Sequence, residues 1–267
     1  MNHLINKKEV MKKIIALSFI LFALTSMYAV DMNCCGTSKK TSGDVLIGIQ
    51  GRIESAMNRC FMLNSVSPLD SLSGSLDGLD KRNNLVQYWK AYVDYYKSVF
   101  YMKLGNRVES EKVIKEASAA LNNSTDKTSE DYALLALIQS FSIQFASGME
   151  AGKISSEIRR NAEKAVELDS ANARGWYVLG SNDYYTPASF GGGSKVEYYL
   201  KKAISAVSKN EDASCHPTWG REYAYGLLIR YYIQNGKTEE AKACLSEAEE
   251  EYPDSYFLSG YKEKLGL

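Results

Sequence analysis

The sequence predicts an all-α protein built from antiparallel helical hairpins, and three observations lead to this fold class. Apolar residues recur at intervals of three and four along most of the chain, which is the spacing of one helical face. The 267 residues include only four prolines and show no sustained alternation of apolar and polar residues that would indicate strands. Segments rich in glycine, asparagine and proline separate the helical stretches, as expected of tight connections between neighbouring helices.

Residues 1–30 have the organisation of a secretory signal peptide rather than that of a folded segment. Lys12 and Lys13 precede an apolar run, and small and polar residues follow it as far as Ala29, the expected cleavage position. Met11 is an alternative start, because the chain from that residue contains a complete basic region and apolar run. The apolar run is shorter than the length that a transmembrane helix usually needs. We therefore expect an exported, periplasmic bacterial protein with no transmembrane segment after cleavage.

Residues 31–43 are polar and are expected to form a disordered linker, and residues 44–267 are expected to form a single all-helical domain. The residues before Cys34 are not the small apolar ones that precede a lipid-modified cysteine, which argues against lipid anchoring through Cys34. Removal of residues 1–30, with four lysines and one glutamate, changes the formal net charge from 0 to −3. A mildly acidic surface argues against a nucleic-acid partner, which would require a basic patch.

The first half of this domain is predicted to hold one helix, a loop and a degenerate hairpin. Residues 45–63 carry an amphipathic pattern. Residues 64–82 are rich in serine, glycine and aspartate, and we interpret them as a long loop with at most a short turn of helix. Residues 88–104 form an aromatic helix that a glycine–asparagine pair ends, and residues 108–121 form the helix that returns beside it.

The second half is predicted to be a continuous series of helices. A helix over 129–146, capped by Thr128 or Ser129, is apolar on almost every face and is expected to be buried and central. The segment from Gly148 to Gly152 is expected to separate it from the next helix. Further helices are expected over 154–168, two within 173–204, and then over 219–234, 239–250 and 255–265. Apart from the last segment, which covers the end of the series, the chain therefore has about nine helices.

Residues 173–204 form the clearest helical pair. Its two apolar faces consist of Trp176, Leu179 and Gly180, and of Val196, Leu200 and Ala203. Gly180 inside a helix costs roughly 1 kcal/mol relative to alanine, and a close approach of another backbone would explain this cost. Ala203 is small where the two helices would cross. The segment therefore predicts a tight helical crossing.

The W-x-x-L-G spacing of Trp176, with the small and bulky residues that follow it, resembles the tetratricopeptide repeat (TPR). A second unit matches at Tyr232, Gly236, Ala241, Leu245, Ala248 and Pro253. The resemblance implies a right-handed superhelical stack of antiparallel helical hairpins. The stretch from Trp176 to Val196 is about four residues longer than the family pattern. The extra residues lie in an elbow, Thr186-Pro187-x-x-Phe190-Gly191-Gly192, that resembles the elbow of some bacterial periplasmic TPR-like proteins without a settled activity.

The sequence offers little for catalysis or for metal binding. After residue 30, His216 is the sole histidine, and adjacent residues such as Cys215 and His216 rarely have the geometry of nucleophile and base. The glycines before Lys195 lack the order of a phosphate-binding loop; they permit a tight elbow, and Ser194 is expected to help cap the helix after it. The cysteines show no zinc-site spacing and leave disulfide pairing open; they are Cys34, Cys35, Cys60, Cys215 and Cys244. We expect no enzyme, no cofactor and no metal.

In TPR proteins the inner face of each first helix lines a concave groove. The resemblance places Arg174, Tyr177, Ser181, Tyr184, Tyr185, Tyr223 and Arg230 on that face. Tyrosine and arginine are typical anchors of interfaces, although the tyrosines could also simply fill space between helices. The first hypothesis is therefore a non-catalytic scaffold that binds a protein or an extended peptide in the groove. The alternative is a small-molecule-binding accessory protein of a periplasmic transport system, with an apolar pocket lined by the 129–146 helix.

Overall fold

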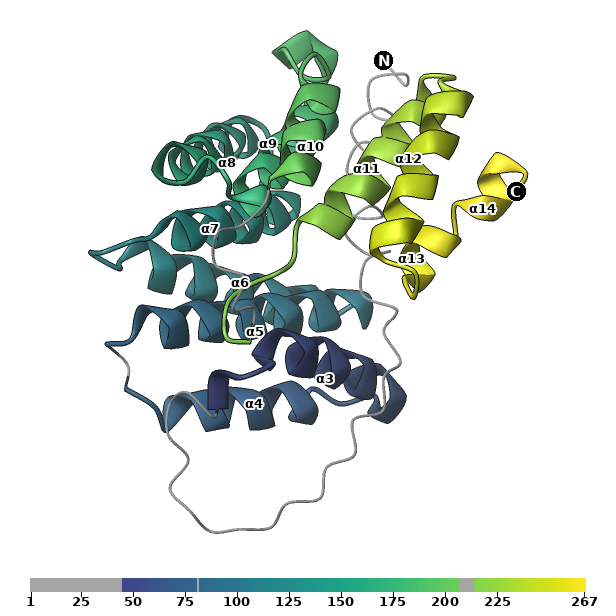
Figure 1. The fold of residues 1–267 in the computed structure, drawn as a ribbon. Helices are drawn as coiled ribbons and strands as arrows, with labels where there is room; N and C mark the ends of the chain where they lie inside the picture. The colour runs from purple at the N-terminus through teal and green to yellow at the C-terminus, as the bar shows by residue number, and fades with distance from the viewer. Residues whose placement is uncertain (1–44, 81, 207–213) are drawn as a thin grey trace. The chain divides into compact units, whose positions relative to one another are not determined.

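The computed structural model describes residues 45–80, 82–206 and 214–267, and their regular structure is entirely helical (Figure 1). In this part of the chain, ten α-helices of ten or more residues, α3 to α12, precede two short helices, α13 and α14. The all-α fold class is confirmed, and nine of these ten helices correspond to predicted ones. The predicted signal peptide and linker lie outside the described residues.

The described residues form two compact units. The N-terminal unit contains residues 45–126, apart from 81, together with 214–218, and the C-terminal unit contains residues 127–206 and 219–267. The single domain over 44–267 stays a prediction. None of the helices in the described ranges combines the length and the apolar character needed to cross a membrane.

The N-terminal unit consists of four helices, α3 (Ile49–Leu63), α4 (Ser67–Asp77), α5 (Asn84–Lys103) and α6 (Arg107–Asn122). The prediction of a loop over 64–82 is wrong, because Leu69 and Leu76 are fully buried two helical turns apart in α4. Pro68 lies in the first turn of α4, where its missing N–H is not needed. The helix α3 begins later than predicted, since Gly48 takes a left-handed conformation (φ 63°) just before it.

Aromatic side chains of α5 form the centre of the N-terminal unit. Tyr88, Trp89, Tyr92 and Phe100 are fully buried, so these two tyrosines pack between helices. The Trp89 indole N–H donates to the carbonyl of Cys215 at 2.9 Å, which ties the segment 214–218 to α5. In this unit, burial rather than binding explains the high aromatic content.

Two buried serines hold α5 and α6 together. The hydroxyl of Ser98 donates to the carbonyl of Ser110 at 2.7 Å, and the hydroxyl of Ser110 donates to the carbonyl of Ser98 at 2.8 Å. A reciprocal pair of hydrogen bonds satisfies both hydroxyls inside the unit, as buried polar groups require.

The C-terminal unit is a stack of three helical hairpins (Figure 1). Each hairpin pairs consecutive helices, and the first helix of each hairpin also contacts the first helix of the next. The helices are α7 (Ser129–Ser142), α8 (Met149–Leu168), α9 (Ala173–Tyr185), α10 (Val196–Ser205), α11 (Arg221–Gln234) and α12 (Thr238–Glu251), followed by α13 (Tyr256–Ser259) and α14 (Lys262–Leu265). This arrangement confirms the predicted TPR-like stack of hairpins.

Several helix ends differ from the prediction. A capping box of Thr128 and Asp131 starts α7, which ends at Ser142 and passes into a short 3-10 helix, η2 (Ile143–Phe145). The helix α8 starts at Met149. Of the segment from Gly148 to Gly152 predicted to separate two helices, only Gly148 therefore lies outside α8, and Gly152 lies inside it. In place of one closing helix over 255–265, the chain forms α13 and α14 with a turn between them.

The predicted close crossing within 173–204 is confirmed. A Cβ atom added to Gly180 on α9 would lie 2.6 Å from Cδ2 of Leu200 on α10. Ala203 is fully buried on α10. Because no side chain of α9 separates the two helices at Gly180, α10 packs directly against the backbone of α9. This crossing fixes one face of α9, and the other faces of α9 contact α7, α8 and α11.

Candidate binding site

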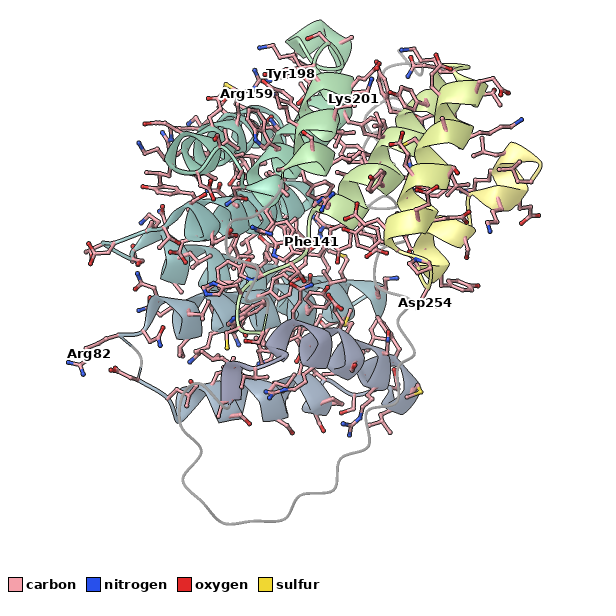
Figure 2. The ribbon with its side chains drawn as sticks, in the orientation of Figure 1. Arg82, Phe141, Arg159, Tyr198, Lys201 and Asp254 are labelled. Carbon is pink, nitrogen blue, oxygen red and sulfur yellow. The ribbon has the colours of Figure 1, made fainter. Side chains whose placement is uncertain are left out.

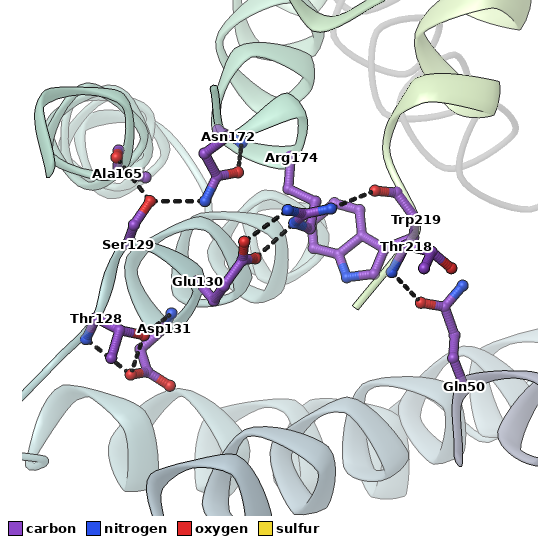
Figure 3. Close-up of polar contacts among 11 residues, drawn as sticks. Gln50, Thr128, Ser129, Glu130, Asp131, Ala165, Asn172, Arg174, Thr218 and Trp219 are labelled. Atoms are coloured by element: carbon purple, nitrogen blue, oxygen red, sulfur yellow. Dashed lines mark hydrogen bonds and ion pairs between the residues drawn. The ribbon is translucent and has the colours of Figure 1, made fainter. Parts of the chain in front are cut away.

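The start of α9 is fixed by a chain of hydrogen bonds that joins three helices (Figure 3). Asn172 is the N-cap, and its side-chain oxygen accepts from the backbone N–H of Gly175 at 2.9 Å. Its amide nitrogen donates to the hydroxyl of Ser129 at 2.7 Å, and that hydroxyl donates to the carbonyl of Ala165 at 2.8 Å. The first turn of α9 is therefore attached both to the start of α7 and to the end of α8.

Arg174, the first of the predicted groove residues, is buried and fully engaged (Figure 3). Its guanidinium donates two hydrogen bonds to the carboxylate of Glu130, at 2.5 and 2.6 Å, and a weaker one to the carbonyl of Trp219 at 3.4 Å. Trp219 lies before α11 rather than inside it, because Gly220 (φ 113°) changes the direction of the chain there. Gly220 also packs closely against the backbone of Arg174. We call Glu130, Asn172, Arg174 and Trp219 the packed base.

Tyr177 and Ser181 follow on the same face of α9 and are also buried. The ring of Tyr177 lies 6.4 Å from the ring of Trp219 and 5.8 Å from that of Tyr223 on α11. The hydroxyl of Ser181 forms a hydrogen bond with the Tyr177 hydroxyl, and burial raises the pKa of Tyr177 well above its usual range. Tyr177 therefore connects the packed base to the tyrosines further along α9 and α11.

The far end of α9 carries Tyr184 and Tyr185, which are half-buried. Their rings meet edge to face with centroids 4.7 Å apart, and the hydroxyl of Tyr184 donates to the side-chain carbonyl of Gln234 at 2.5 Å. Burial, with a smaller contribution from Tyr185, raises the pKa of Tyr184 to about 12. These contacts join the end of α9 to the end of α11.

Arg230 extends from α11 into this group of tyrosines. It donates to the hydroxyl of Tyr185 at 3.5 Å, and the hydroxyl of Tyr261, between α13 and α14, also interacts with its guanidinium. Within the described residues no carboxylate lies within 4.0 Å of the guanidinium. Arg230 is thus a half-buried cation held by phenol groups.

We define the tyrosine–arginine cluster as Tyr177, Tyr184, Tyr185, Tyr223, Arg230 and Tyr261. The seven predicted groove residues lie in one unit and are linked by contacts, but they differ in depth. Arg174, Tyr177 and Ser181 are buried, whereas Tyr184, Tyr185, Tyr223 and Arg230 remain partly exposed. Whether these residues line a binding groove stays a prediction. Glu130, Trp219 and Tyr261 were not predicted as site residues, and only the aromatic character of the last two is visible in the sequence.

The elbow between α9 and α10 is a rigid turn built on glycine. Gly191 and Gly193 take left-handed conformations (φ 82° and 89°), and a Cβ on Gly192 would lie within 1.9 Å of the Thr186 carbonyl oxygen. The prediction that Ser194 caps α10 is wrong. The buried carboxylate of Asp183 instead accepts from the backbone N–H of Lys195 at 2.7 Å.

Phe190 and Tyr198 are exposed aromatic side chains outside the cluster. Phe190, in the short 3-10 helix η3 (Ala188–Phe190) of the elbow, is 79% exposed. Tyr198, on α10, is 54% exposed (Figure 2). Neither belongs to the face that α9 and α11 share, so Tyr198 can serve as a control for variants of the tyrosine–arginine cluster.

Among the described residues, Cys60, Cys215, Cys244 and His216 are not gathered into a site. Cys60 on α3 and Cys244 on α12 are buried, as expected of small apolar residues, and burial raises the pKa of Cys244 to about 12. Cys215 and the exposed His216 lie in the segment 214–218 of the N-terminal unit. In the described part of the chain, no three His, Cys, Asp or Glu side chains are grouped so that they could hold a metal ion.

Two solved structures resemble this chain. The HusA haemophore from Porphyromonas gingivalis is 21% identical, with a TM-score of 0.52, over 68% of this chain and 94% of its own. A thermophilic TPR protein of Thermus thermophilus is 19% identical, with a TM-score of 0.51, over 80% of this chain and 98% of its own. Neither a protein-family model nor a curated protein sequence matches the chain. At these identities the likeness establishes the fold, which is TPR-like.

Proposed function

We propose that this protein is a non-catalytic scaffold that binds an extended peptide, or an exposed segment of a partner protein, at the tyrosine–arginine cluster. One observation carries the proposal: α9, α11 and the turn at Tyr261 bring half-buried phenol rings and a guanidinium together. Tyrosine and arginine are the residue types that dominate binding energy at interfaces. Stacked helical hairpins commonly present such side chains on an extended surface.

The signal-peptide pattern of residues 1–30 supports a location outside the cytoplasm. We propose that the mature protein works in the periplasm of a bacterium. Its partner would then be another exported protein or the exposed part of a membrane protein.

The test compares the wild-type chain with two tyrosine variants, all expressed in the native host. The cluster variant replaces Tyr185 and Tyr223 with serine, and the control variant replaces Tyr198, which is exposed on α10, with serine. Partners are captured by chemical cross-linking and identified by mass spectrometry, and thermal melting verifies that both variants are folded. We expect one protein to be recovered with the wild type and with Tyr198→Ser but lost with the cluster variant. Equal recovery from all three chains would contradict binding at the cluster.

The alternative function, binding of a small molecule, is favoured by one feature of the same cluster. The tyrosine rings of the cluster and the guanidinium of Arg230 can pack against a flat, anionic molecule as well as against a peptide. Haem, which the description of HusA implies for that protein, is a suitable probe. Titration with haem, followed by its absorbance, should saturate at one equivalent in the wild type and weaken in the cluster variant. No saturation would contradict this alternative.

A further inference from the structure

We propose that Arg230 binds a carboxylate group of the peptide, and that the tyrosines beside it contact the adjoining side chain. This inference rests on the proposed function and deepens it, because it names the chemical group that the cluster recognises. It begins from a contrast within the C-terminal unit. Arg174 has the carboxylate of Glu130 as a partner, whereas Arg230 has phenol hydroxyls in place of a carboxylate.

The partial burial of Arg230 explains why the lack of a carboxylate partner among the described residues matters. An exposed arginine needs no counter-ion, because water stabilises its charge. Arg230 is half-buried and is surrounded by the rings of Tyr184, Tyr185 and Tyr261, which displace part of that water. The guanidinium of Arg230 has five N–H donors and contacts the hydroxyls of Tyr185, at 3.5 Å, and Tyr261, so donors remain for an incoming acceptor.

The surroundings of Arg230 favour an anion. Lys264 lies 5.3 Å from the ring centre of Tyr261 and adds a second positive charge next to the cluster. Two carboxylates of this unit have other partners: Glu130 accepts from Arg174, and Glu222 accepts from the hydroxyl of Ser255. Asp183 accepts from the backbone of Lys195, at the elbow. Thus no carboxylate of the described residues neutralises the cluster.

The geometry points to a carboxylate rather than to a phosphate. A single planar guanidinium matches the two oxygens of a carboxylate, whereas peptide phosphates are usually recognised by clusters of arginines. The half-buried rings of Tyr185 and Tyr223 supply apolar surface for the side chain beside the carboxylate. An aromatic or aliphatic residue that carries a free carboxylate, such as the last residue of a peptide, combines both features.

The test uses two probes of similar size and shape, the charged N-acetylphenylalanine and the neutral N-acetylphenylalanine amide. Each is titrated into the full chain with isotope-labelled tyrosine, and binding is followed by NMR. We expect the acid to bind about tenfold more tightly than the amide, the effect of one charge-assisted hydrogen bond. Resonances that Tyr185→Phe and Tyr223→Phe assign should shift on binding.

Variants of Arg230 and of a control arginine on α8 complete the test. Arg230→Gln should remove the preference for the acid, and Arg160→Gln, which changes an exposed arginine of α8, should leave it intact. Arg230→Lys keeps the charge without the planar fork and should give an intermediate preference, which preserves the test if the glutamine variant fails to fold.

Two outcomes would overturn the inference. If acid and amide bind equally and both are lost in Tyr223→Ala, the cluster binds apolar side chains, and the proposed scaffold function stands without a carboxylate. If neither probe shifts the tyrosine resonances at millimolar concentration, while cross-linking still recovers a partner through the cluster, Arg230 does not recognise this group.

Discussion

The packed base at the start of α9 and the tyrosine–arginine cluster further along α9 and α11 each contain one arginine, and the surroundings of the two arginines differ. Arg174 is inside the unit, with a bidentate carboxylate partner and a carbonyl. Arg230 is half-buried among phenol rings, and no carboxylate of the described residues pairs with it. A repeat pattern places both residues on one face, but the depth of each residue and its partner decide whether it stabilises the fold or is available to a ligand.

The largest expected effect is a difference in the free energy of unfolding between alanine variants of Arg174 and Arg230. Arg174→Ala leaves Glu130 without its partner inside the unit, and should lower the free energy of unfolding by about 3 kcal/mol. Arg230→Ala breaks no ion pair with a described residue, and should change it by less than about 1 kcal/mol. Urea unfolding followed by tryptophan fluorescence measures both. A loss below about 1 kcal/mol for Arg174→Ala would remove the distinction between the two regions.

The second effect tests how tightly the region behind the cluster is packed. Ala203→Leu adds a large side chain at a fully buried position of α10, and should cost about 1–3 kcal/mol because the core must shift to accommodate it. The matched control is Ala188→Leu, at an exposed position of the elbow, which should be close to neutral. Thermal melting of both variants checks this, and unchanged stability of Ala203→Leu would argue against the close crossing.

A smaller effect compares two helical glycines. Gly152 in α8 has open space around it, so Gly152→Ala should stabilise the protein by about 0.5–1 kcal/mol through helix propensity. At Gly180 the added methyl would meet Leu200 at 2.6 Å, so Gly180→Ala should instead destabilise it. If both substitutions stabilised the protein to the same degree in urea unfolding, α9 and α10 would not be in backbone contact.

The smallest expected effect concerns the ionisation of the cluster. Burial raises the pKa of Tyr184 from 10.0 to about 12, so the folded state retains the phenol proton more strongly than the unfolded state does. The resulting stabilisation is complete below pH 10 and is lost as the pH rises towards about 12. Tyrosinate absorbance should show a late-ionising component in the wild type that is diminished in Tyr184→Phe. Identical titration curves would place Tyr184 in contact with solvent.

Local spacing was sufficient to predict most of the fold. Gly180 and Ala203 indicate a close crossing because small residues at helical spacing have a direct geometric consequence, and the structure contains that crossing. The helix α4 escaped prediction because its serines, aspartates and glycine suggest a loop by composition. Leu69 and Leu76, with Pro68 in the first turn, carry the helical signal.

Helical periodicity groups the predicted groove residues, but it does not indicate how deeply each of them is buried. The predicted groove residues lie on α9 and α11, and periodicity identifies their shared face. The partner of Arg174 is Glu130, 44 residues earlier in the chain, and no local pattern reveals a pairing over that distance. No local pattern indicates the contact of Asp183 either. Its carboxylate fixes the start of α10, but it was not predicted as a site residue.

The elbow between α9 and α10 has a consequence for how the chain tolerates changes in length. Asp183 fixes the first turn of α10 through the backbone of Lys195, and Gly180 fixes the crossing of α9 and α10, so both of these contacts are made by residues outside 187–192. The exposed tip at Phe190 can therefore accept an insertion, such as an epitope tag or a fluorophore site, without altering the order in which the hairpins stack.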